Sequence, residues 1–243
     1  MPTLICYTET PPEHVASQVI DMATEYLTDI ALSAIPSSNA LYPAHQAAMA
    51  VEIGTYLYGI GRSSEARVEL IVACDDLHPS KVLGFLLYLP LKGSLEACGV
   101  TYMAVLKSRR GEGVARSMIA LMLERYPHAE LSCPIPKVPF YESLGFQVIG
   151  VYVTQVRMNT REKSADSVIG VLDMGRVFSH ESVVFEKHRQ TQKYGVRAMN
   201  DAEKQLKRLR DQLSRKANLF VAERLDGVTV DLQYGMYTGQ KNV

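Results

Sequence analysis

The sequence predicts an α/β (α+β) fold followed by a helical C-terminal extension. Apolar residues recur at helical spacing through most of the first 60 residues, whereas short β-rich runs follow one another from about residue 67. After residue 160, apolar residues return at spacings of three and four over a long stretch. We therefore divide the chain into a mixed domain over residues 1–160 and an extension over residues 161–243.

One strand and two helices are predicted before residue 60. Thr3–Thr8 has the composition of a short strand, and two prolines follow it. From Glu13 to Ala34 the apolar residues share one helical face, which predicts an amphipathic helix. A second helix is predicted from Pro43 to Tyr58, because Gly59 and Gly61 end the pattern.

Three strands are predicted next. The runs Arg67–Cys74 and Val82–Leu91 are β-rich, and a polar, turn-rich loop separates them, which predicts a hairpin with a longer loop. In Gly99–Leu106 the side chains Val100, Tyr102 and Ala104 alternate with their neighbours, as they do in a strand.

Two helices and two strands complete the mixed domain. A helix is predicted over Gly113–Tyr126, where the apolar residues share a face, and a short strand over Ala129–Cys133. A short helix is predicted over Lys137–Leu144, ended by Gly145. Phe146–Thr154 is the last clear strand that the pattern predicts.

The extension begins with a polar, linker-like stretch, and Ser167–Phe178 fits either a strand or a short helix. From Glu181 to Leu225 the pattern is helical, with a break expected near Gly195. The tail Asp226–Val243 is interpreted as a strand or an extended arm. A narrow apolar seam, similar to that of a coiled coil, runs along the long helix through Met199, Ala202, Leu206, Leu209, Leu213, Ala217 and Phe220.

The charge is unevenly distributed along the chain. The 26 Lys/Arg and 26 Asp/Glu give a formal net charge of zero, which argues against a general affinity for nucleic acid. Residues 101–160 hold 7 Lys/Arg against 4 Asp/Glu, whereas residues 1–100 hold 4 against 11. A ligand rich in phosphate would therefore find a favourable potential in the middle block.

Cysteine and histidine spacing predicts neither a disulfide framework nor a metal site. The four cysteines form no Cys-x-x-Cys pair, and the six histidines show no ligand spacing. The N-terminus lacks the pattern of a signal peptide, and no run of 18 apolar residues occurs. We therefore expect a cytoplasmic protein with no membrane segment.

The run Arg109-Arg110-Gly111-Glu112-Gly113-Val114-Ala115 joins a predicted strand to a predicted helix. The first N–H groups of a helix have no partners within it, and the helix dipole adds positive potential there. Gly111 and Gly113 leave the backbone open to an anion, while Arg109 and Arg110 supply charge. The run is typical of a pyrophosphate cradle, although a plain strand–helix turn with surface arginines also fits it. Rossmann and P-loop patterns are absent.

A second run, Val138-Pro139-Phe140-Tyr141-Glu142-Ser143-Leu144-Gly145-Phe146, follows after one predicted helix and one predicted strand. Together the two runs resemble the GNAT superfamily of N-acetyltransferases. The loop fits that family's Arg/Gln-x-x-Gly-x-Gly/Ala signature at Arg110, Gly113 and Ala115, and the second run resembles its other signature. The resemblance covers roughly Thr3–Asn159.

The resemblance implies a mixed, mostly antiparallel twisted sheet flanked by helices, which splays between the strands ending near Leu106 and Cys133. Acetyl-CoA (coenzyme A) would lie in the gap, with its pantetheine arm paired to the preceding strand like an added strand. Tyr141 would protonate the leaving thiolate as the general acid. The implied cofactor-binding residues are Met103, Ala104, Val105, Arg109, Arg110, Gly111, Glu112, Gly113, Val114 and Ala115.

The general base is less clearly indicated. Many GNAT enzymes carry a carboxylate on the strand before the loop, but Gly99–Leu106 has none. Glu96 lies just before this strand and Glu69 on a neighbouring one, so we take these two as the candidate bases. Other groups nearby are Asp75, Asp76 and Tyr102.

Two functions therefore stand side by side. The first is transfer of an acetyl group from acetyl-CoA to an amine of an unidentified acceptor. The alternative is a structural or assembly protein with the same fold, for example in a virus particle, in which catalysis is weak or vestigial. The seam within residues 179–225 favours a homo-oligomer or a larger assembly. Residues 181–216 hold 10 Lys/Arg against 5 Asp/Glu, which we interpret as a solvated face rather than a nucleic-acid site.

Overall fold

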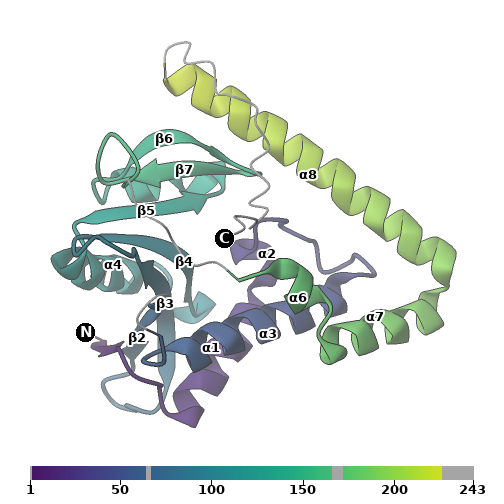
Figure 1. Ribbon diagram of the computed structural model, residues 1–243, viewed down its shortest axis with the longest axis horizontal. Coiled ribbons are helices and arrows are strands. Elements are labelled where there is room, and N and C mark those ends of the chain that lie inside the picture. Colours follow the sequence, from purple (N-terminus) through teal and green to yellow (C-terminus); the bar gives the residue numbers. More distant parts are fainter. Residues whose placement is uncertain (1, 64–66, 166–171, 226–243) are drawn as a thin grey trace, which may run out of the picture.

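The computed structural model describes residues 2–63, 67–165 and 172–225 (Figure 1). Its centre is a twisted seven-stranded sheet with the order β1-β2-β3-β4-β5-β7-β6. All neighbours pair antiparallel except β4 and β5, which are parallel, and helices flank the sheet. The predicted fold class is therefore confirmed. The strands are β1 (Thr3–Tyr7), β2 (Glu69–Cys74), β3 (Val82–Pro90), β4 (Ala97–Val105), β5 (His128–Cys133), β6 (Gln147–Tyr152) and β7 (Gln155–Asn159).

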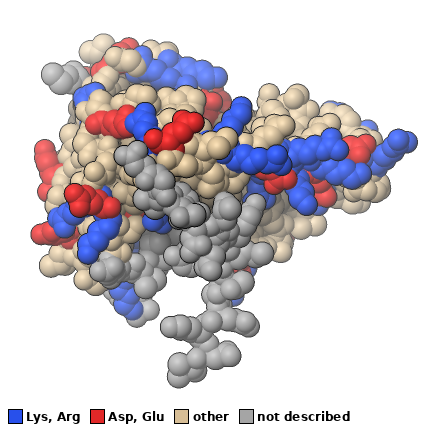
Figure 2. Space-filling model, turned by 90° about the horizontal axis from the view of Figure 1, so that it is seen from above, with Lys and Arg blue, Asp and Glu red and all other residues tan. Residues whose placement is uncertain are grey.

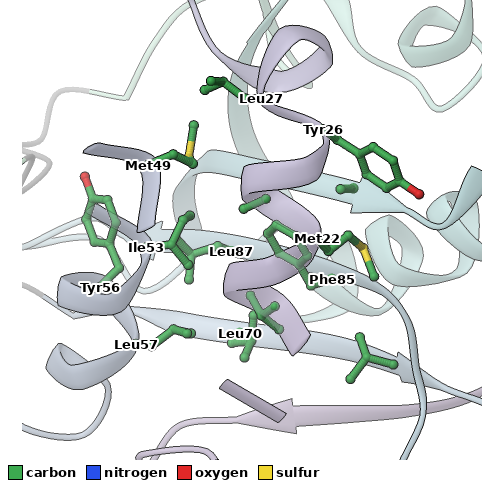
Figure 3. Close-up of a cluster of buried hydrophobic side chains, with 14 of the residues drawn as sticks. Met22, Tyr26, Leu27, Met49, Ile53, Tyr56, Leu57, Leu70, Phe85 and Leu87 are labelled. Carbon is green, nitrogen blue, oxygen red and sulfur yellow. The ribbon is translucent and has the colours of Figure 1, made fainter. Parts of the chain in front are cut away.

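The helices α1 (Glu13–Glu25), α2 (Leu27–Ile30) and α3 (Tyr42–Gly59) lie on one face of the sheet. Figure 3 shows how side chains from α1 and α3 meet those of β2 and β3 in one buried cluster. We call this side the α1–α3 face. Its burial supplies much of the driving force for folding, because it removes large apolar side chains from water.

The helix expected from Glu13 to Ala34 ends at Glu25, and α2 follows as a separate short helix. Tyr26 connects the two helices. Its hydroxyl accepts a hydrogen bond from the N–H of Lys107 at 3.1 Å, and its ring lies under the guanidinium of Arg110 at 4.9 Å. A residue from a distant loop thus stabilises a non-helical conformation that local periodicity does not indicate.

The opposite face is covered by α4 (Val114–Arg125) and α5 (Val138–Glu142), with the short 3-10 helix η2 (Ile135–Lys137) before α5. Buried residues of α4 and α5 form a second apolar cluster with β2, β3, β5 and β7. We call this side the α4–α5 face.

The sheet does not end with the strand predicted over Phe146–Thr154. That segment is β6, and the chain then turns at Val153 and Thr154 into β7, which lies between β5 and β6. Val153 has a positive φ of 55°, which a β-branched residue rarely adopts. The turn lacks the Asn-Gly or Asp-Gly signature of a tight hairpin, so the pattern predicted one strand where there are two. The Thr154 hydroxyl donates to the carbonyl of Leu32, which holds this turn against the α2–α3 loop.

The extension contains α6 (Met174–Phe178), α7 (Glu181–Tyr194) and the long α8 (Val196–Arg224). The expected break occurs at Gly195, whose φ is 83°. Met199 and Ala202 are buried in the α1–α3 cluster, whereas Val221 is buried in the α4–α5 cluster. The seam is thus partly used by the chain's own domain. The division at residue 160 stays a prediction, and the predicted strand or arm over 226–243 lies outside the described residues.

The opposite side of α8 is polar. Figure 2 shows Lys and Arg side chains along the projecting part of the molecule, where α7 and α8 meet. Along α8, Lys204, Arg208 and Arg215 are exposed. In the part of the chain that is described, no helix has the length and hydrophobicity needed to cross a bilayer.

Candidate active site

The two central strands β4 and β5 separate from each other. They pair only at Ala97–His128, Cys98–Ala129 and Gly99–Glu130. Beyond Gly99, β4 continues to pair with β3 on one side, while β5 pairs with β7. The middle of β4, residues 100–103, is half-exposed although both of its ends are buried. The sheet is therefore splayed, and one edge of β4 is left free to pair with an extended ligand.

The loop after β4 is open towards an anion. Lys107–Arg109 form a 3-10 turn (η1), and Gly111 and Gly113 adopt φ values of 86° and 81°. At either glycine a Cβ atom would meet nothing within 4 Å. Gly113 is the N-cap of α4 and supplies no side chain to its first turn. Among the described residues, none accepts a hydrogen bond from the N–H groups of 111–116. These donors and the helix dipole form a cradle that fits a pyrophosphate.

The two arginines of the loop are held by carboxylates. Arg109 lies 2.8 Å from Asp75 and 3.4 Å from Glu112. Arg110 lies 3.2 Å from Asp29 of α2, and its Nε donates to the carbonyl of Val105. The Arg110–Asp29 pair is exposed on both sides, at 40% and 47%, so water screens it and it contributes little to stability. The Arg109 side chain is 36% exposed, but its partner Asp75 is only 8% exposed.

Tyr141 lies in α5, directly after the segment that follows β5. It is 9% exposed, and its ring packs edge to face with Phe140 and Phe146 at centroid distances of 5.1 Å and 5.9 Å. Burial, with a smaller contribution from Cys133, raises the pKa of Tyr141 above its ordinary value, so the hydroxyl keeps its proton at neutral pH. No described residue hydrogen-bonds this hydroxyl. Its proton is therefore available to a ligand.

Glu69, one of the two expected bases, lies at the start of β2 and is 2% exposed. The hydroxyls of Tyr88 and Tyr126 each donate to it at 2.8 Å, and Arg67 and Arg125 form ion pairs with it at 2.8 Å and 3.1 Å. Burial, together with this carboxylate, raises the pKa of Tyr126 to about 12. Because its oxygens already have four partners, this placement favours a structural role for Glu69 on the α4–α5 face.

Glu96, the other expected base, precedes β4 at the closed end of the splay. It is exposed and forms an ion pair with Arg161 at 3.0 Å. The structure thus brings neither carboxylate into contact with Tyr141 or with the open half of β4 among the described contacts.

A carboxylate that the sequence analysis missed does reach β4. Glu52 of α3 is 7% exposed, and its Oε1 accepts a hydrogen bond from the hydroxyl of Tyr102 at 2.8 Å. Tyr102 occupies the half-exposed middle of β4. The available signal was the position of Glu52 on the buried face of its helix, four residues after Ala48 and four before Tyr56. A charged residue at such a position is rarely buried without a partner or a function.

Comparisons with known proteins agree with this geometry. A family model described as the acetyltransferase (GNAT) domain matches residues 66–148, which include both sequence runs. Residues 66–148 are therefore similar to the GNAT acetyltransferase domain. No curated protein matches the sequence significantly.

The chain is similar to several solved structures at low sequence identity. The PaiA N-acetyltransferase of Thermoplasma acidophilum, solved in complex with coenzyme A, is 10% identical with a TM-score of 0.50, covering 65% of this chain and 99% of its own. An acyl-CoA N-acyltransferase of Pseudomonas aeruginosa (12% identity, TM-score 0.47) and a GNAT acetyltransferase of Staphylococcus aureus Mu50 (11%, 0.45) each cover 66% of this chain and all of their own.

Proposed function

We propose that this protein transfers an acyl group, in the first instance acetyl, from acetyl-CoA to an amine of an acceptor by direct attack. The observation that carries the proposal is the set of free N–H groups at residues 111–116, placed at the open end of the β4–β5 splay. A pyrophosphate binds such a helix start without any change in the backbone. The GNAT domain over residues 66–148 supports the same ligand.

The cofactor arm would extend from this loop along the unpaired edge of β4. The backbone of Met103, Ala104 and Val105 offers N–H and C=O groups there because β5 has diverged. Pairing of this kind orients the thioester by main-chain hydrogen bonds, so that little side-chain chemistry is needed for positioning.

Tyr141 is proposed as the general acid. When the amine attacks the thioester carbonyl, the carbon–sulfur bond breaks and the thiolate takes the Tyr141 proton. The raised pKa keeps that proton in place until a strong acceptor appears.

Isothermal calorimetry with acetyl-CoA, followed by measurement of thiol release in the presence of an amine library, tests the proposal. We expect binding with one cofactor per chain and thiol release that depends on the amine. Failure of acetyl-CoA to bind at millimolar concentration would refute it.

An assembly role for the extension is a second proposal, and exposed apolar residues of α7 favour it. Phe185 is 69% exposed and Val184 is 54% exposed, on a helix that otherwise packs against α3 and α8. Large apolar side chains exposed next to each other favour a protein–protein contact.

A further inference from the structure

We propose that Glu52 and Tyr102 together accept the proton of the attacking amine, with Tyr102 as the group that touches the acceptor and Glu52 as the final proton acceptor behind it. This inference rests on the proposed acyl transfer. It assigns the group that deprotonates the acceptor amine, because β4 carries no carboxylate of its own.

The position of the pair is the first argument. Tyr102 lies in the half-exposed middle of β4, immediately before the residues proposed to pair with the cofactor arm. An arm that runs from the phosphate loop towards the closed end of the splay passes Val105, then Ala104 and Met103, and so leads to the level of Tyr102. The reacting carbonyl would therefore lie close to the Tyr102 side chain.

The second argument concerns the two faces of the sheet. Tyr102 packs in the α1–α3 cluster, whereas Tyr141 belongs to the α4–α5 cluster. In a fully paired sheet the strands would separate groups on the two faces. Here β4 and β5 diverge beyond Gly99, so a ligand in the gap can reach side chains from both faces. An acid on one side and a base on the other suit a reaction in which one proton leaves the nucleophile and another joins the leaving group.

The third argument is the surroundings of Glu52. The titratable groups that face it are Tyr102 of β4 and Tyr56 of its own helix, with Tyr152 at the end of β6 interacting with both tyrosines. Among the described residues, no Lys, Arg or His forms an ion pair with Glu52. Burial raises the pKa of its carboxyl group above the usual value, so it is a stronger base than a solvated glutamate. A buried, ionised carboxylate that accepts only one hydrogen bond destabilises the folded protein. Because Glu52 is therefore not explained by a contribution to stability, its presence favours a functional role.

The proton inventory balances. One proton of the acceptor's ammonium group moves to the Tyr102 oxygen as the hydroxyl proton of Tyr102 moves to Glu52 Oε1. The nitrogen lone pair that this frees forms the bond to the carbonyl carbon, and the second proton on the nitrogen then passes to solvent. The carbon–sulfur bond breaks, and the thiolate takes the proton of Tyr141. Glu52 ends protonated and Tyr141 ionised, and solvent restores both.

The test compares two acceptors, because the natural acceptor is not needed to see base catalysis. Ethylamine is protonated at neutral pH and must lose a proton to react, whereas hydroxylamine is already an unprotonated nucleophile. Thiol release from acetyl-CoA is measured with each acceptor, for the wild-type protein and for Glu52→Gln, Tyr102→Phe and a control, Glu124→Gln, at an exposed residue near the end of α4. Acetyl-CoA affinity is measured in parallel by calorimetry.

We expect Glu52→Gln and Tyr102→Phe to lower kcat with ethylamine about 100-fold. They should change the rate with hydroxylamine less than about threefold, and the acidic limb of the ethylamine pH profile should be lost. Acetyl-CoA affinity should be unchanged in all the variants, and Glu124→Gln should keep the wild-type rate with both acceptors.

Equal losses with both acceptors would overturn the inference, because they would indicate a structural defect. A wild-type rate with ethylamine in Glu52→Gln would also overturn it while leaving the proposed function intact. If the wild-type protein binds no acetyl-CoA or releases thiol with neither acceptor, the proposed function itself fails, and the inference with it.

The melting temperature separates a folding defect from a catalytic one. The ionised Glu52 is unfavourable in the folded state, so its raised pKa means that stability falls as pH rises through the carboxyl range. Glu52→Gln removes the destabilisation that the buried charge causes, and its amide oxygen can still accept the hydrogen bond from the Tyr102 hydroxyl. Its Tm at neutral pH should equal or exceed that of the wild type, and a large decrease would count against a functional role.

Discussion

The guanidinium of Arg109 lies 2.8 Å from the carboxylate of Asp75, which ties the phosphate loop to the β2–β3 hairpin. Asp75 also accepts hydrogen bonds from the N–H groups of Leu77 at 2.9 Å and His78 at 3.2 Å. These two bonds, with a smaller contribution from Arg109, lower the pKa of Asp75 below its ordinary value. One carboxylate therefore orders its own loop and orients an arginine beside the proposed pyrophosphate site.

Asp75→Asn should lower thermal stability at neutral pH. Because the folded-state pKa is depressed, the ionised Asp75 stabilises the fold above the unfolded pKa, and this contribution is lost as pH falls through the folded pKa. Melting curves from neutral to strongly acidic pH should show the difference between variant and wild type shrinking with acidification. Glu112→Gln, which removes the more distant and exposed partner of Arg109, is the control and should behave like the wild type.

Gly113→Val should weaken acetyl-CoA binding by at least tenfold, because it places a branched side chain at a positive φ and in front of the first N–H groups of α4. Gly93→Val is a matched control, since Gly93 has a φ of 86° and is equally open, but lies in the β3–β4 loop. Calorimetry on both variants distinguishes the effect of blocking the N–H groups of the phosphate loop from a general effect of backbone strain. Equal loss of affinity in the two would contradict the assignment of the loop.

Tyr141→Phe should lower turnover by about 100-fold and leave the affinity for acetyl-CoA within about twofold of the wild type. The aromatic packing on Phe140 and Phe146 is kept, so only the proton is removed. Steady-state thiol release and calorimetry give the two quantities. Tyr58→Phe, at a tyrosine that is 65% exposed, is the control. A fully active Tyr141→Phe protein would remove Tyr141 from the mechanism.

Glu69→Ala should destabilise the fold by about 2–3 kcal/mol, because it leaves two buried tyrosine hydroxyls without their acceptor. Urea unfolding measures this difference. Under conditions where the variant is folded, its kcat should stay within a few-fold of the wild-type value if Glu69 is structural. A 100-fold loss of kcat in the folded variant would instead return Glu69 to the list of bases.

Phe185→Glu should lower the oligomeric mass measured by light scattering if α7 forms an assembly surface. The side chain is 69% exposed in the single chain, so the substitution should leave the Tm nearly unchanged. Leu95→Glu, at a residue that is 87% exposed in the loop before β4, is the control and should keep the wild-type mass. An unchanged mass for Phe185→Glu would argue against assembly through this helix.

The sequence predicted most of the sheet and the loop correctly, because these features depend on local patterns. Alternation over Gly99–Leu106 and the glycines at 111 and 113 are properties of neighbouring residues. The start of α4 and the break at Gly195 follow in the same way from residues that favour one backbone conformation.

Contacts between distant segments could not be predicted in this way. Tyr26, between α1 and α2, accepts a hydrogen bond from a loop 81 residues away, and the Val153 turn is bonded to Leu32 through Thr154. The local sequence around Tyr26 or Val153 does not indicate which distant residue will contact it.

The sequence by itself determined the match of residues 66–148 to the GNAT acetyltransferase domain, with a strand, a glycine loop and a helix in that order. Only the tertiary structure decided which carboxylate stands beside that strand. Glu52 and Tyr102 are 50 residues apart and meet because α3 packs its buried face against the middle of β4. Burial of one charged side chain depends on the whole core around it, and no periodicity in the sequence specifies which residue of another element will lie opposite.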